Sequence, residues 1–537
     1  LTSNFANKRV THASGPGLHQ GHAWYPRHNP WLIALAVMLS TFLEVLDSSV
    51  ANVALPHIAG NLSASNHEAT WVLTSYLVAN AVILPAAAWF GGFFGRKRFL
   101  VVCTVIFVAS SAFCGLANSL GMLIFARVVQ GVGGGALVPI SQAVLMESFP
   151  IEKRGLANAV FALGVIVAPI MGPTIGGWIT DNLSWRWVFF INVPIGALSV
   201  FMVRKYVEDP PYIKRDQAAK IDYIGFLLMA VGLGMLQVIL DKGQEVDWFE
   251  AAWLCWASWG VVLSLTAFVF WELHTKNPVV NLRILKNRNF ATGVVIITVV
   301  GAILYGTTTL LPLFLQSLMG YSAYLAGLAT SPRGIGAFCA AMIAGRLSGL
   351  IDGRWILAFG LAFLGVTCYN LGSINLDIGM MNIVWPIIGT GVGMSAIFVS
   401  LSTITLANLK NEEMGNGTGL FNLMRNIGGS IGIAMATTMI ARMSQIHQTM
   451  LVSHLTPYDP VFQEKFHAIS HMMAQTGHGT SPALAMGYIY QELLKQSALL
   501  AYCDNFHWFG IGSLICIPLV FLFRAVHIPK GETLAVH

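Results

Sequence analysis

The chain has 537 residues, of which 55% are hydrophobic and only 10% are charged. A soluble domain usually carries about 25% charged residues, so this composition excludes an ordinary soluble fold. The net charge of +6 alone would suit an anionic partner such as nucleic acid, but the positions of the basic residues point elsewhere. Six of the seven cysteines lie in apolar segments and no CxxC occurs, which is typical of cysteine used as a small hydrophobic residue.

Long apolar runs recur along the whole chain. The runs 100–117 and 251–271 contain no charged residue, and about 20 apolar residues suffice to cross the hydrocarbon core of a bilayer. Because backbone polar groups must be paired within lipid, such runs predict helices. The sequence therefore predicts an all-α polytopic membrane protein with 14 spans, at 31–54, 69–91, 99–117, 121–146, 156–180, 187–206, 221–240, 251–271, 290–315, 321–345, 355–372, 383–407, 417–441 and 505–525.

Lysine and arginine are distributed unevenly between these spans. An even number of spans puts both termini on one side of the membrane. If that side is cytoplasmic, the inner segments, counted together with the span ends that adjoin them, hold 22 of the 30 basic residues. The outer segments hold five, and three lie deeper within spans. Basic residues are enriched in cytoplasmic loops. We therefore expect a multi-pass protein of the cytoplasmic (inner) membrane with both termini cytoplasmic, and we expect no binding to nucleic acid.

The spans group as six, two and six. A turn rich in glycine and arginine follows the second span of each six-span block, at 91–98 and at 345–354, which suggests a duplicated bundle. The expected parts are a cytoplasmic N-terminal tail at 1–30, an N-terminal six-helix bundle at 31–206, linkers with two extra transmembrane helices at 207–289, a C-terminal six-helix bundle at 290–525 with an external loop at 443–504, and a cytoplasmic tail at 526–537.

Several short motifs resemble those of a known family. LDSSVANVALP at 46–56 resembles the first-helix signature of fourteen-span drug:proton antiporters, and LxxxRxxQGxG at 123–133 resembles the fourth-helix motif of the major facilitator superfamily. GPxxGG at 172–177 is similar to a fifth-helix antiporter motif. The segments 189–196 and 240–249 resemble the EmrB/QacA group, and the likeness runs from about residue 31 to 525.

This resemblance implies a major facilitator fold, in which two six-helix bundles are joined by two additional transmembrane helices. It also implies multidrug efflux, in which lipophilic or amphiphilic small molecules are exported by antiport with protons, and the proton gradient takes the place of any cofactor. A transporter of another cargo, such as a lipid, fatty acid or peptide, remains the main alternative. The chain contains no GxxxxGK[ST], HExxH or GxSxG motif, so it offers no sign of an ATP-driven pump or a membrane enzyme.

Glu44 and Asp47 are the candidate proton-coupling acids. They are three residues apart, so they share one face of the first helix. Charges in the middle of a span are costly and usually face a cavity or a partner. Arg127 should lie at a similar depth in the fourth span, so we expect it beside these acids. The alternatives are a structural polar pair sealed by neighbouring helices and an arginine that caps a packing contact.

Other candidate residues are less specific. The resemblance implies that Gly172, Pro173, Gly176 and Gly177 form a face that seals against the second bundle. Arg333 and Arg425 are cations within spans that could bind anionic groups of a substrate or brace neighbouring helices. The candidate polar contacts to the substrate or between the bundles are Asn52, Arg333, Asn422 and Arg425.

The inner turns contain the candidate residues of the superfamily's inner-loop motif, which are Gly95, Arg96, Lys97, Asp352 and Arg354. In the superfamily an aspartate of the first of these turns usually braces the two bundles, but here that position is Gly92. The resemblance therefore does not extend to the acidic residue of this brace, whereas Arg96 and Lys97 are retained.

The segment between the last two spans is long. We expect amphipathic helices there, outside the membrane, and a surface on which a periplasmic adaptor protein of a tripartite efflux system could dock. His467 and His471 have the i, i+4 spacing of a metal site, but no acid or cysteine completes the ligand set, so no metal is expected.

Overall fold

The computed structural model describes residues 26–150, 153–211, 222–348, 350–475 and 482–524. Its regular structure there is entirely helical. The helices are α1 (Pro30–Asn61), α2 (Asn66–Ala69), α3 (Trp71–Phe94), α4 (Arg96–Gly115), α5 (Leu120–Gly134), α6 (Leu137–Ser148), α7 (Arg154–Asn182), α8 (Trp187–Phe190), α9 (Asn192–Tyr206), α10 (Tyr223–Lys242), α11 (Ala252–His274), α12 (Arg288–Ser317), α13 (Ala323–Thr330), α14 (Pro332–Leu347), α15 (Gly353–Leu371), α16 (Met380–Ala407), α17 (Met414–Val452), α18 (Pro460–Gln475) and α19 (Pro482–Val520), with short 3₁₀ turns at 244–246, 248–250, 282–286 and 411–413.

Each of the fourteen predicted spans coincides with a helix or a pair of successive helices. Twelve helices within the described ranges are long and apolar enough to cross a membrane. The predicted spans 321–345 and 417–441 are not among these twelve, and they correspond to the pair α13–α14 and to α17. The fold is therefore that of a polytopic membrane protein, and the span count of fourteen is only partly supported. Residues 1–25 of the predicted tail at 1–30, the predicted tail at 526–537 and most of the linker at 207–220 lie outside the described residues.

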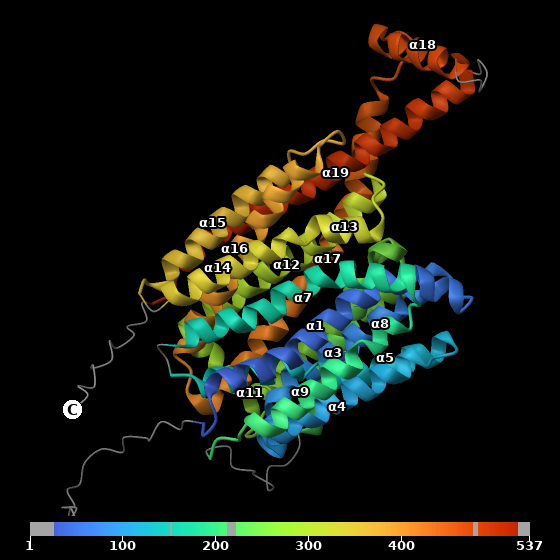
Figure 1. Ribbon diagram of the computed structural model, residues 1–537. Coiled ribbons are helices and arrows are strands. Elements are labelled where there is room, and N and C mark those ends of the chain that lie inside the picture. The colour runs from blue at the N-terminus through green and yellow to red at the C-terminus, as the bar shows by residue number, and fades with distance from the viewer. Residues whose placement is uncertain (1–25, 151–152, 212–221, 349, 476–481, 525–537) are drawn as a thin grey trace, which may run out of the picture.

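The helices run side by side in one large bundle (Figure 1). Helix pairing repeats between its two halves. In the first half α1 packs on α7, α3 on α5, and α4 on α5 and α9. In the second half α12 packs on α17, α14 on α16, and α15 on α16 and α19, which is the same pattern. The two halves meet where α7 packs against α13, α14 and α16 and where α17 packs against α3 and α6. The two additional helices pair with each other, and α10 also contacts α3 and α17.

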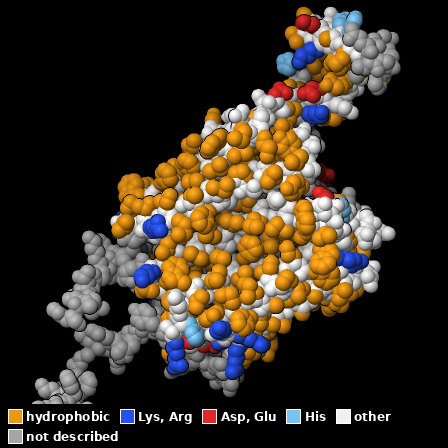
Figure 2. All heavy atoms as spheres, in the orientation of Figure 1, with side chains coloured by type: hydrophobic (Ala, Val, Ile, Leu, Met, Phe, Trp, Pro, Cys, Tyr) orange, Lys and Arg blue, Asp and Glu red, His pale blue; other side chains and the backbone are white. Residues whose placement is uncertain are grey.

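The surface of the bundle is apolar. Figure 2 shows hydrophobic side chains over most of the visible bundle, with charged side chains mainly toward its ends and on the projecting α18 region. On α11 the side chains of Trp256 and Phe270 are 76% and 67% exposed. Water would disfavour such a surface, whereas lipid covers it without cost. The location of the exposed apolar side chains therefore agrees with a bilayer around the bundle.

Two helices extend beyond this bundle. α17 and α19 each have 39 residues, so each is about 58 Å long at 1.5 Å per residue, almost twice the thickness of a hydrocarbon core. Their outer ends carry α18, which lies beyond the bundle in Figure 1. Nε2 of His447 on α17 lies 2.7 Å from Oδ2 of Asp504 on α19, which joins the two helices. The predicted loop at 443–504 is therefore mostly helical, as its amphipathic pattern suggested.

The glycines of the fourth span provide close packing. A Cβ on Gly131 would lie 2.5 Å from the carbonyl oxygen of Tyr76, and a Cβ on Gly133 would lie 2.8 Å from that of Cys103. Glycine at these positions lets α5 approach α3 and α4 to backbone contact. The run Gly131–Gly135 therefore acts in packing, which fixes the position of the neighbouring polar residues of α5.

Candidate functional site: a buried charge network in the first bundle

Asp47 and Arg127 form an ion pair inside the first bundle. Nη1 of Arg127 on α5 lies 2.6 Å from Oδ2 of Asp47 on α1, and the two residues are 0% and 1% exposed. A charge-assisted hydrogen bond of this length is among the strong ones. The sequence-based expectation that Arg127 lies beside a first-helix acid is confirmed by this contact.

The other oxygen of Asp47 is held by two amides. Nε2 of Gln130 on α5 donates to Oδ1 at 2.9 Å, and Nδ2 of Asn192 on α9 donates to the same oxygen at 2.6 Å. Asn192 also donates to the hydroxyl of Ser111 on α4 at 2.9 Å. The carboxylate of Asp47 therefore accepts hydrogen bonds from two other helices, α5 and α9. Gln130 and Asn192 were not predicted as site residues, although both lie within the quoted motifs and are amides in apolar spans.

Arg127 is fixed from a third helix. Its Nε donates to the backbone carbonyl of Val72 on α3 at 3.1 Å, and its guanidinium carbon lies 4.1 Å from the centre of the Tyr76 ring. Nη1 also donates to Oε1 of Gln130 at 2.8 Å. Nη2 is buried and makes no hydrogen bond within the described ranges. Within the described part of the chain, the guanidinium therefore has one donor group without a hydrogen-bond acceptor.

Glu44 has different surroundings from Asp47. It is 9% exposed, and its Oε1 accepts hydrogen bonds from Asn80 Nδ2 at 2.9 Å and from the Tyr76 hydroxyl at 3.2 Å. Both donors are neutral groups of α3. Its cationic neighbour is Arg425 of α17, which interacts with Glu44 electrostatically from the second bundle. Of the two acids, Glu44 is therefore the one whose charged neighbour belongs to the other bundle. Its electrostatic interaction depends on how the two bundles are placed.

Arg425 is itself poorly satisfied. Its Nε and Nη1 are buried and make no hydrogen bond within the described ranges, while Nη2 donates to Asn426 at the long distance of 3.4 Å. Its guanidinium carbon lies 5.9 Å from the centre of the Phe398 ring. The Tyr305 side chain is a further hydrogen-bonding partner of Arg425. These partners are neutral, so the buried cation gains from a nearby carboxylate. Tyr76 touches both Glu44 and Arg127, so it connects this second charge pair to the first.

Polar contacts join the two bundles near the end at which α1 begins. Arg154 Nη2 lies 3.2 Å from Asn411 Oδ1, and Asn158 Nδ2 lies 3.1 Å from the hydroxyl of Thr403. Deeper in the bundle, Asn422 Nδ2 donates to Gln142 Oε1 at 2.6 Å. These contacts hold the two halves together at that end. Asn422 is thus a contact between the bundles, whereas Asn52 is exposed and lies outside this set.

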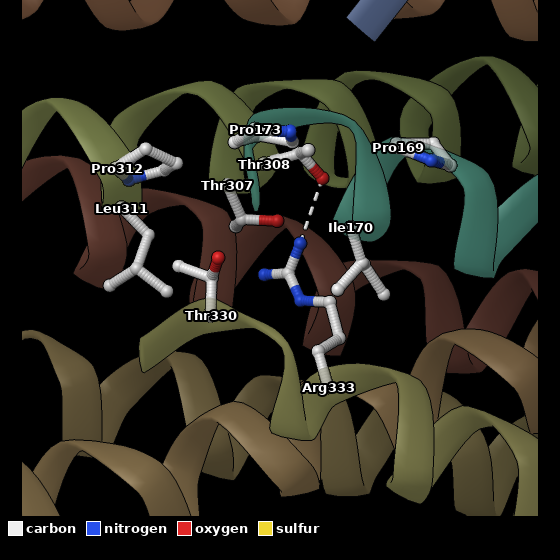
Figure 3. A pocket seen from close by; sticks show the side chains of 9 residues that line it. All are labelled: Pro169, Ile170, Pro173, Thr307, Thr308, Leu311, Pro312, Thr330 and Arg333. Carbon is white, nitrogen blue, oxygen red and sulfur yellow. Dashed lines mark hydrogen bonds between the residues drawn. The ribbon is translucent and has the colours of Figure 1, made fainter. Parts of the chain in front are cut away.

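The packing of the α7 motif differs from the expectation. A Cβ on Gly176 would lie 3.0 Å from Val50, and a Cβ on Gly172 would collide with Ser49, so both glycines face α1 of their own bundle. The expectation that this glycine face packs on the second bundle is therefore wrong. The reason is geometric, because close helix contact within the first bundle requires small residues there. Pro173 instead lies on the side of α7 that faces the second bundle, beside Thr308 and Arg333 (Figure 3).

Ser49 has a second role at this contact. Pro173 has no N–H to donate to the carbonyl of Pro169, one helical turn earlier. The hydroxyl of Ser49 donates to that carbonyl at 2.9 Å and satisfies it. Ser49 therefore links α1 to the proline-containing turn of α7, two residues from Asp47.

The inner-turn residues form separate pairs. Gly95, with a φ of +85°, ends α3 in a conformation that favours glycine, and α4 begins at Arg96. Arg96 forms an ion pair with Glu147 at the end of α6, and the backbone N–H of Lys97 donates to Asp209 at 2.8 Å. Glu147 thus supplies an acidic partner from a different helix than the one that the superfamily pattern uses.

In the second half Asp352 pairs with its neighbour Arg354, with 2.6 Å between Nη2 and Oδ2. Although partial burial opposes ionisation, the hydrogen bonds from Arg354 lower the pKa of Asp352. Arg354 also donates to the backbone carbonyl of Phe523 at 3.3 Å, which ties this turn to the end of α19. The pair therefore acts locally, within the second bundle.

Comparison with known proteins shows which family the chain belongs to. The profile of the Major Facilitator Superfamily matches residues 37–433. The chain belongs to that superfamily.

Within it, the chain is 37% identical to the multidrug export protein EmrB of Haemophilus influenzae, over 90% of this chain and 93% of that protein. It is 36% identical to the fatty acid resistance protein FarB of Neisseria gonorrhoeae, over 92% of this chain and 96% of that protein. These relatives place the chain in the EmrB-like group. The solved structure of the human organic anion transporter MFSD10 shares the fold at a TM-score of 0.59 and 11% identity, over 92% of this chain and all of that one.

Proposed function

We propose that this protein is a proton-coupled antiporter that exports lipophilic or amphiphilic small molecules by alternating access. The observation that carries the proposal is the buried ion pair between Asp47 and Arg127, surrounded by hydrogen-bond donors from α5 and α9. An ion pair at this depth is costly and usually marks a substrate or proton path in a membrane protein. EmrB-like relatives, which are named multidrug export proteins, support the cargo class.

The chemistry follows from the two acids. In the proposed cycle Asp47 exchanges its ion pair with Arg127 for a proton when the two side chains move apart. Glu44 interacts instead with Arg425 of the second bundle, so separation of the bundles would take its cationic neighbour away. Movement between the two access states would thus change the protonation of both acids. Coupling needs no cofactor besides the proton gradient.

The direction of transport rests on the orientation of the chain. We place the end at which α1 begins in the cytoplasm of a cell whose inner membrane holds the protein, and the α18 projection on the opposite side. The excess of basic residues at the first end supports this placement. With that orientation, the contacts of Arg154 and Asn158 would close the path toward the cytoplasm. The projecting ends of α17 and α19 offer a surface for a periplasmic adaptor of a tripartite efflux system.

A second cargo class fits the same machinery. A relative of similar identity is named a fatty acid resistance protein, which favours a lipid, fatty acid or other amphiphilic acid as an alternative to neutral or cationic drugs. The coupling mechanism would be the same for either cargo. An enzymatic role is not proposed.

The proposal is tested with purified protein in proteoliposomes whose lumen is acidic. Wild-type protein should concentrate members of a panel of lipophilic compounds in the lumen, and the concentration should collapse when an ionophore dissipates the pH gradient. The variant Asp47→Asn keeps the shape of the side chain but cannot ionise, so it should lose accumulation while still folding. Accumulation by Asp47→Asn at the wild-type rate would show that coupling does not pass through Asp47.

A further inference from the structure

A small pocket lies between the two bundles, apart from the charge network. Residues of α7 line one side of it and residues of α12, α13 and α14 line the other (Figure 3). Most of the lining is apolar or a threonine hydroxyl, and the one charged lining residue is Arg333. Because the two sides belong to different bundles, the pocket must change size when the bundles move relative to each other.

Arg333 lacks an acidic partner. It is 3% exposed, its Nε donates to the Thr390 hydroxyl at 3.0 Å, and its Nη1 donates to the Thr308 hydroxyl at 2.7 Å. Its Nη2 is buried and makes no hydrogen bond within the described ranges. None of the nine lining residues is acidic, and no carboxylate of the described chain forms an ion pair with Arg333. Arg127, by contrast, has Asp47 as its partner.

A buried guanidinium without a counter-ion is unfavourable. It carries five N–H donors and a charge that always stays on, so neutral threonine hydroxyls satisfy only part of it. Such a group favours an anion that reaches it from outside the protein. The surrounding side chains favour an anion that also has an apolar part, because Pro173, Leu311 and Pro312 form an apolar wall beside the cation (Figure 3).

We propose that Arg333 binds the carboxylate of an exported amphiphile, with Thr308 beside it as a second hydrogen-bonding group. The apolar tail then lies against Leu311 and the prolines of α7 and α12. A single guanidinium matches a monoanion, and its paired N–H groups fit a carboxylate in two-point geometry. This inference rests on the proposed function; it selects the amphiphilic acids among the proposed cargo classes and assigns a binding residue for their carboxylate.

In this structure the pocket is too small to hold an amphiphile. Its volume is about 10 Å³, which is room for one water molecule. An amphiphile therefore needs the bundles to part between α7 and α12. Gly327 of α13 is part of this contact, since a Cβ there would lie 2.7 Å from the backbone nitrogen of Thr174. The site is thus closed in this state and would open as the two halves move apart on this side.

Equilibrium binding tests the proposal separately from proton-driven transport. The probe is radiolabelled dodecanoate, measured on the whole protein in nanodiscs of zwitterionic lipid, with empty nanodiscs subtracted. Dodecanol serves as the uncharged probe of the same length. Arg333→Gln should weaken dodecanoate binding roughly tenfold or more, as expected for loss of a hydrogen-bonded charge contact, and should leave dodecanol binding unchanged. Arg346→Gln, at an exposed position of the same helix, should bind both probes as wild type does.

The outcomes separate the alternatives. Equal dodecanoate binding by wild type and Arg333→Gln would overturn the proposal, and so would equal loss of both probes, because that pattern indicates a structural role. If phosphatidylglycerol in the nanodisc lowers dodecanoate binding by wild type to the level of Arg333→Gln, the site takes a lipid phosphate and the proposal is wrong. If wild type and Arg333→Gln bind the two probes as expected but wild type shows no pH-driven transport, the proposed function is refuted and the binding site stands.

Discussion

At the residue scale, Asp47 and Arg127 are expected to behave as one unit. Removing either partner leaves the other as an uncompensated buried charge, which costs about 3–5 kcal/mol. The double variant Asp47→Asn/Arg127→Gln removes both charges, so its loss of stability should be smaller than the sum of the two single losses. Thermal unfolding of the purified variants measures this coupling, and additive losses would contradict a mutual dependence of the two side chains.

Substitution of Glu44 tests whether its interaction with the second bundle takes part in transport. Glu44→Gln removes the charge that faces Arg425 but keeps the hydrogen bond with Asn80 within reach. We expect weaker proton coupling or a narrower range of cationic cargo, seen as a smaller ratio of accumulated to external compound across a panel. Arg425→Gln is the matched variant and should change the same ratio. Wild-type ratios for both variants over the whole panel would show that this pair takes no part in coupling.

The residues of the site could be predicted to different degrees from the sequence. Asp47 and Arg127 stand out because a charge within an apolar span needs a partner, and their depths in antiparallel spans can be compared by counting residues. Gln130 and Asn192 carry a weaker signal, since uncharged amides are common in polytopic proteins. The electrostatic interaction between Glu44 and Arg425 could not be predicted, because it depends on how the two bundles are placed.

At the scale of elements, the packing of α7 on α1 gives a testable consequence. A methyl group on Gly172 would collide with Ser49, the residue that satisfies the carbonyl of Pro169. Gly172→Ala should therefore destabilise the protein by about 1–3 kcal/mol, the usual cost of overpacking, and should slow transport. The control is Gly92→Ala on α3, where an added Cβ meets nothing within 4 Å. Equal thermal stability and transport in both variants would argue against a tight contact between α1 and α7.

The helices themselves followed from the apolar runs, but two features of them did not. The sequence placed the glycines of 172–177 on the second bundle, whereas Gly172 and Gly176 pack on α1, since small residues indicate a close contact without naming the partner. The amphipathic pattern of 443–504 predicted helices there, but it did not predict that they are continuous with the last two spans. In the structure α17 and α19 each run through a predicted span and a part of 443–504 without a break.

At the scale of the whole molecule, the orientation can be measured on single introduced cysteines. Thr456 lies in the exposed turn between α17 and α18, and Asn277 lies in the exposed turn that follows α11. In intact spheroplasts an impermeant thiol reagent should label Thr456→Cys and leave Asn277→Cys unlabelled until the membrane is broken, with the unmodified chain as the blank. Labelling of Asn277→Cys alone would reverse the orientation and, with it, the direction of transport.

The central claim is that movement of cargo and movement of protons are one process. Its most direct measurement is the pH inside acid-loaded vesicles that contain the purified protein, followed by a trapped dye while cargo is added outside. Exchange of cargo for protons predicts that the lumen becomes less acidic on addition of cargo, with a rate that follows cargo uptake and vanishes in Asp47→Asn. Uptake of cargo by wild-type protein with no change of lumenal pH would contradict the account.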